Sequence, residues 1–190
     1  MPYGHPKTWR SYTFGGITMS PSWVMSLTKL KTLSLEVAPK LMSLPPLEKL
    51  PFLELLTIQP VCSLKKVGVE FLGKESENKK EDIVFPNLKR LWFLLLGEWK
   101  EWIGIGGMRV GGKEDKNCIT IMPHFQVLKL FGCGKLNSLP DFLRTTTLKE
   151  LRIIASPILK EHCQRETGED WHKISQIPFI KFNKYYSKFG

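Results

Sequence analysis

Leucine and similar apolar residues recur along this chain at one fixed spacing, which constrains the fold more than any other feature. The unit reads Leu30-x-x-Leu33-x-Leu35, followed by further apolar residues at every third position. Five segments share this frame, and they begin at Leu30, Leu53, Leu88, Phe125 and Leu148. The central alternation suits a short β-strand with one buried face. The later spacing of three suits a turn and an irregular or 3₁₀ return.

This spacing is the leucine-rich-repeat pattern. It predicts an α/β fold in which residues 1–190 form a single leucine-rich-repeat domain, a solenoid shaped as a short horseshoe. The parallel β-sheet is expected on the concave face, and a mostly irregular or 3₁₀ chain on the convex side. A weaker frame with Tyr12 and Phe14 predicts a further strand before the five repeats.

The uneven distances between repeats predict two loop insertions, a charged one over residues 74–83 and a glycine-rich one over residues 104–117. End repeats need cover for their exposed cores. A C-terminal cap is therefore expected over residues 160–182. The residues expected to provide apolar cover are Trp171, Ile177, Ile180 and Phe182.

Composition and charge narrow the environment of the chain. The formal net charge is +10, but the 28 Lys and Arg residues are spread along the chain, which argues against a nucleic-acid surface. The longest run of large apolar residues, over 91–96, is far shorter than the ~20 residues of a membrane-spanning helix. The N-terminus lacks the apolar segment of a secretory signal, and the four cysteines form no C-x-x-C pair. We expect reduced thiols, a cytoplasmic location and no membrane association.

Residues Gly107 to Lys113 match the phosphate-binding spacing G-x-x-x-x-G-K, but Glu114 stands where Ser or Thr would hold Mg²⁺. The flanking residues are not the apolar strand and helix that such a loop joins. A flexible glycine-rich loop is the preferred interpretation, and nucleotide binding stays an alternative.

Other chemistry has little support. His162, Cys163 and His172 lie near Glu169 and Asp170, but without the spacing that directs ligands at one metal ion. We interpret this segment as solvated and polar. No catalytic signature is present, and Cys133 falls where the repeat uses Asn or Cys to contact neighbouring backbone. The prediction is no enzyme, no cofactor and no metal.

The remaining candidate for a functional site is the surface formed by the residues that alternate with the buried positions of each strand. The residues predicted to form a protein-binding concave face are Arg90, Trp92, Leu94, Lys129, Phe131, Glu150 and Arg152. Trp92 and Phe131 are expected at equivalent positions of successive repeats, where exposed aromatic side chains beside a cation are typical of binding hot spots. The alternative is that the insertion loops cover these rings.

Several phrases carry a family resemblance: LPPLEKLPFLELLTI (44–58), FPNLKRLWF (85–93), ITIMPHFQVLKLFGCGKLNSLPDFLRTTTLKELRI (119–153) and CQRETGEDWHKISQIPFI (163–180). With them, the chain resembles the C-terminal leucine-rich-repeat region of plant nucleotide-binding leucine-rich-repeat (NB-LRR) disease-resistance proteins of the coiled-coil kind, as a fragment or truncated form. The resemblance implies a non-catalytic part in plant defence that senses pathogen effectors or modified host proteins and restrains a nucleotide-binding switch domain. Its partners would be these proteins and that domain. A leucine-rich-repeat adaptor for ubiquitin ligation stays an alternative.

Overall fold

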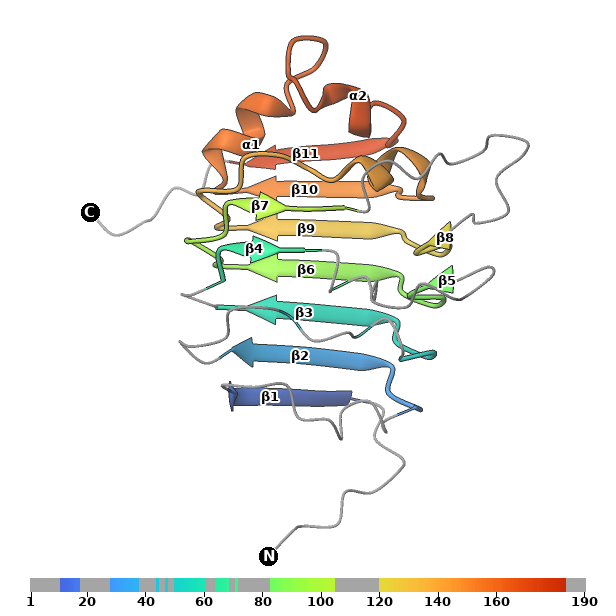
Figure 1. Cartoon of the computed structure of the whole chain (residues 1–190). Coiled ribbons are helices and arrows are strands. Elements are labelled where there is room, and N and C mark those ends of the chain that lie inside the picture. The colour runs from blue at the N-terminus through green and yellow to red at the C-terminus, as the bar shows by residue number, and fades with distance from the viewer. Residues whose placement is uncertain are drawn as a thin grey trace, which may run out of the picture.

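The computed structural model describes residues 11–17, 28–37, 44, 47, 50–60, 64–68, 71, 83–104 and 120–183. Its main feature is a seven-stranded parallel sheet (Figure 1). In the order in which neighbours are hydrogen-bonded, the strands are β1 Ser11–Ile17, β2 Thr32–Val37, β3 Leu55–Gln59, β6 Arg90–Leu94, β9 Val127–Phe131, β10 Glu150–Ile154 and β11 Phe179–Asn183. Neighbours in the sheet therefore follow one another in the chain.

The register of the sheet pairs like positions of successive repeats. Leu33 lies opposite Leu56, and Leu91 lies opposite Leu128, which in turn lies opposite Leu151. All five of these leucines are fully buried. Because side chains alternate between the two faces of a strand, this register gives one continuous apolar face.

Two strands extend the sheet beyond the five repeats. The predicted strand at Tyr12 and Phe14 is present as β1, which pairs with β2. At the other end, β11 places Ile180 opposite Leu151 and Phe182 opposite Ile153. The residues expected only to cover the last repeat thus continue its hydrogen-bonded ladder, because Ile180 and Phe182 alternate with polar residues as a strand requires.

Short segments form a second layer. β4 Lys66–Val67 pairs with β7 Glu101–Trp102, and β5 Ile83–Val84 pairs with β8 Thr120–Ile121, both in parallel. Ile83, predicted to lie in an insertion, is thus part of a strand. The rest of both predicted insertions, apart from Gly104, lies outside the described residues, and so does the Gly107–Lys113 stretch.

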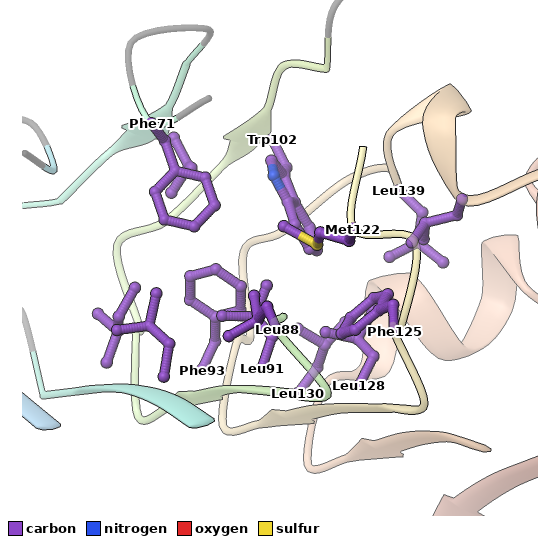
Figure 2. Close-up of a cluster of buried hydrophobic side chains, with 14 of the residues drawn as sticks. Phe71, Leu88, Leu91, Phe93, Trp102, Met122, Phe125, Leu128, Leu130 and Leu139 are labelled. Carbon is purple, nitrogen blue, oxygen red and sulfur yellow. The ribbon is translucent and has the colours of Figure 1, made fainter. Parts of the chain in front are cut away.

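Aromatic side chains fill the space between the second layer and the main sheet (Figure 2). The Phe93 ring of β6 lies 4.6 Å from Trp99 and 5.1 Å from Trp102, centroid to centroid. Phe71 lies 5.1 Å from Phe85, and all of these side chains are buried. The third-residue spacing after Phe93 therefore points Trp99 and Trp102 into the core, as the repeat pattern predicts.

Helices are short, namely η4 Asp141–Thr145, α1 Pro157–His162 and α2 Trp171–Ile174. Around α2, Ile174 and Ile177 are buried, and Trp171 packs against the core. The fold is mostly parallel sheet with little helix, which is compatible with the predicted α/β repeat class.

The turns that follow three of the strands repeat one backbone conformation. Leu95, Gly132 and Ala155 have φ angles of 59°, 69° and 50°. Each donates its N–H to the last residue of the next strand: Leu95 to Phe131 (2.6 Å), Gly132 to Ile154 (2.9 Å) and Ala155 to Asn183 (3.3 Å). This left-handed conformation favours glycine, so only Gly132 is free of the usual side-chain penalty.

Cys133 follows Gly132 and is fully buried. Its N–H donates to Ser156 Oγ at 3.1 Å, and its Sγ lies 3.8 Å from the carbonyl oxygen of Phe93. The prediction that Cys133 contacts the backbone of a neighbouring repeat is thus confirmed. Burial raises the pKa of its thiol to about 12.

Candidate protein-binding face

The face of the main sheet opposite the core, here called the open face, carries the predicted site residues. On β6, Leu91 and Phe93 are buried while Arg90, Trp92 and Leu94 are exposed or half-buried. β9 and β10 alternate in the same way, with Lys129 and Phe131 on β9 and Glu150 and Arg152 on β10. Strand geometry therefore brings all seven predicted residues to one surface.

The register corrects the predicted relation between Trp92 and Phe131. Trp92 lies opposite Lys129, whereas Phe131 lies opposite Leu94. The two aromatic residues are therefore diagonal neighbours and do not occupy equivalent positions. The expectation was wrong because Phe131 sits two residues further along its strand than the position that matches Trp92.

Lys129 joins the two rings. Its Nζ lies 5.6 Å from the centroid of Trp92 and 6.0 Å from that of Phe131. A cation at such a distance from an aromatic face contributes about 0.5–1 kcal/mol at an exposed site. The indole Nε1 of Trp92 is inaccessible to water and has no hydrogen-bond partner among the described residues. Trp92, Lys129 and Phe131 form one cluster, and each of the three side chains is half-buried.

Charged side chains lie on the neighbouring strands β10 and β11. Arg152 donates through Nε to Glu150 Oε1 at 2.5 Å, and both side chains are partly exposed. An exposed ion pair of this kind contributes under about 1 kcal/mol. Sequence reasoning missed Lys181 on β11, which lies opposite Arg152, and Phe179, which is 52% exposed. The alternation around Ile180 and Phe182 was the signal that could have placed them on a strand.

The C-terminal segment, predicted to be solvated and polar, is different at two positions. Asp170 is only 3% exposed and Cys163 is fully buried. The Asp170 carboxylate accepts hydrogen bonds from the N–H of Leu139 (2.7 Å), Ser138 Oγ (2.8 Å) and Lys173 Nζ (2.8 Å). The prediction was wrong here because Asp170 anchors this segment to the loop before η4.

Burial also governs the Cys163 thiol, whose pKa it raises to about 12, with a further contribution from the nearby Asp170 carboxylate. In the part of the chain that the structure describes, no three His, Cys, Asp or Glu side chains are grouped to hold a metal ion. None of the described helices has both the length and the apolar character to cross a membrane.

Several known proteins of one plant are similar to this chain. "Probable disease resistance protein RF45" and "Probable disease resistance protein RDL5" of Arabidopsis thaliana are each 32% identical to it over 174 residues, which cover 83% of this chain. "Disease resistance RPP8-like protein 3" of the same plant is 30% identical over 136 residues, or 71% of this chain. The chain is related to plant disease resistance proteins.

The chain spans only a small part of these disease resistance relatives, 15% of RF45 and RDL5 and 13% of the RPP8-like protein. No protein-family profile matches it, and no solved structure matches it significantly. The relatives support a role in plant defence.

Proposed function

We propose that this chain is a leucine-rich-repeat region of a plant NB-LRR disease resistance protein of the coiled-coil kind, and that it acts by binding proteins without catalysis. Residues 1–190 form one domain, a short horseshoe-shaped solenoid whose open face is the concave face. Its partners are pathogen effectors or the host proteins that they modify, together with the nucleotide-binding domain that the repeats restrain. The working compartment is the cytoplasm.

The observation that carries this proposal is the Trp92, Lys129 and Phe131 cluster at the centre of the open face. Tryptophan is enriched among the residues that contribute most to protein binding, and aromatic side chains in general are enriched at interfaces. The relatives support a role in plant defence. The parallel pairing of β6 with β9 supports the cluster, because it places Lys129 opposite Trp92.

The test uses a double variant, Trp92→Ala with Phe131→Ala, in the tagged chain expressed in plant leaf tissue. Chemical cross-linking and mass spectrometry identify the proteins captured by the wild type and the variant. We expect the variant to capture about tenfold less of these proteins, which corresponds to a loss of ~1.4 kcal/mol in binding free energy. Its far-UV circular dichroism spectrum should be unchanged.

The matched control is Ser34→Ala with Glu36→Ala on β2, which changes the same face away from the cluster. It should capture as much as the wild type. Equal capture by all three forms would refute a binding role for the cluster. An unfolded double variant would show instead that the two rings belong to the core.

A further inference from the structure

The open face carries two parallel rows of different chemistry. One row crosses β9, β10 and β11 and is basic, with Lys129 opposite Arg152 and Arg152 opposite Lys181. The other row crosses β6, β9 and β10 and is apolar, with Leu94 opposite Phe131 and Phe131 opposite Ile154. The rows are two residues apart along the strands, which is ~6.7 Å.

Few acidic groups face the basic row. Glu150 contacts Arg152, and Arg90 adds a further positive charge on β6. Lys129 lies over the Trp92 and Phe131 rings, and neither Lys129 nor Lys181 forms an ion pair with any described residue. Like charges directly opposite on neighbouring strands repel each other. The row therefore favours an anionic partner that relieves this repulsion.

The apolar row is partly open to solvent. Leu94, Phe131 and Ile154 are each half-buried. Next to them, Leu95 is 53% exposed on the turn after β6. A surface with an apolar row beside a cationic row fits a partner that has the complementary pair of rows.

We infer that the open face binds an amphipathic acidic helix of a partner protein, lying across the strands. This inference rests on the proposed function, in which the open face binds proteins. The apolar side chains of the helix pack on Leu94, Phe131 and Ile154, and its carboxylates meet Lys129, Arg152 and Lys181. From β6 to β11 there are three strand spacings of ~4.8 Å, about the length of ten helical residues at 1.5 Å each.

A helix fits these two rows better than an extended strand or a nucleic acid. One side of a helix presents two adjacent rows of side chains through its i, i+3 and i+4 neighbours, whereas an extended segment sends alternate side chains away from the sheet. Nucleic acids bind through many phosphate contacts and through bases stacked on open rings. Here the cations are few, and Lys129 lies over Trp92.

The experiment measures fluorescence anisotropy of labelled synthetic peptides against the full 190-residue chain. The probe peptide is an acidic helix with leucines on one face and glutamates on the adjacent face. Its control has the same composition in an order that mixes the two residue types around the helix. We expect the probe to bind at least about tenfold more tightly than its control, and added salt to weaken binding.

Two charge reversals provide the matched variants. Lys181→Glu changes the basic row and should weaken probe binding by about tenfold. Lys149→Glu makes the same charge change at an exposed residue just before β10, off the open face, and should stay within about twofold. Both residues are exposed, so both variants should fold, which far-UV circular dichroism checks.

Several outcomes would overturn the inference: no binding of the probe, equal binding of probe and mixed control, or equal effects of the two reversals. Displacement of the probe by an equal concentration of single-stranded oligonucleotide would assign the face to polyanions in general and overturn it as well. If the Trp92 and Phe131 variant loses its captured proteins while the probe does not bind, this inference is refuted and the proposed function is not. If that variant retains them, the proposed function fails too.

Discussion

Asp170 holds the C-terminal segment on the rest of the fold, so its removal should be costly. The carboxylate is 3% exposed and accepts from Leu139 N–H, Ser138 Oγ and Lys173 Nζ. Asp170→Ala leaves the Leu139 N–H without a partner in a buried place. It also removes the close counter-ion of Lys173, whose side chain is only 13% exposed and whose other carboxylate, Asp141, is 3.5 Å away.

The expected loss in free energy of unfolding follows from these contacts. Breaking a buried ion pair by removing one partner costs about 3–5 kcal/mol, and a single hydrogen bond to a charged group contributes about 1.5–3 kcal/mol. Asp170→Ala should therefore cost about 3–5 kcal/mol. Asp170→Asn keeps the shape and one acceptor oxygen, so it should cost less, about 1.5–3 kcal/mol.

Urea unfolding followed by tryptophan fluorescence and far-UV circular dichroism measures these losses. Hydrogen exchange shows in addition whether residues 163–183 open separately from the other strands, since local units can unfold on their own. The control is Glu169→Ala, the exposed neighbour, which should stay within about 0.5 kcal/mol. A loss under about 1 kcal/mol for Asp170→Ala, or one equal to the control, would refute the anchoring role.

Local geometry sets the expected effect of changes at Gly132, at Glu54 and at the two buried cysteines. Gly132→Ala should lower the free energy of unfolding in urea by about 1–2 kcal/mol, because φ is +69° and the new Cβ would lie 2.9 Å from Leu95 Cδ2; an unchanged urea midpoint would contradict the strain. Hydrogen bonds from two lysines lower the pKa of Glu54 to about 2 from 4.5, so its stabilising contribution is complete above about pH 4.5 and is lost as the pH falls toward 2. Because Glu54 lies near the surface, this contribution is under about 1 kcal/mol. The stability difference between the wild type and Glu54→Gln should therefore shrink as the pH falls over that range rather than stay constant. Burial keeps the thiols of Cys133 and Cys163 protonated, with pKa values of about 12; in a variant with the other two cysteines changed to serine, a disulfide reagent at neutral pH should react only after denaturation, and fast reaction of the native chain would show that these thiols are accessible.

Leucine spacing predicts the core of this fold well because strand alternation is a local property of the backbone. Leu91 and Leu128 lie opposite each other because each holds the same place in its repeat. The segment of β11 does match the opening of the frame, as Ile177-x-x-Ile180-x-Phe182, but it contains no leucine and the repeat alignment ends before it. One short apolar match of that kind does not by itself distinguish a strand from an irregular cap.

The open face shows where such prediction ends. Alternation correctly sends Trp92, Lys129 and Phe131 away from the buried leucines, but it does not say which of them meet. Their cluster depends on the register between β6 and β9, which places Lys129 beside Trp92 and Phe131 one pleat further on. Charge alone also made Asp170 look solvated, because its three partners lie outside its own local sequence or on the next turn of α2.

Leucine spacing therefore indicates which side chains point into the core, since the two-residue period of a strand is set by backbone geometry within a few residues. Which polar and aromatic side chains meet depends on the tertiary structure. Contacts such as that between Leu139 and Asp170 join residues 31 positions apart. They form only when the repeats stack in register and the chain returns over its own core, and no local pattern encodes that meeting.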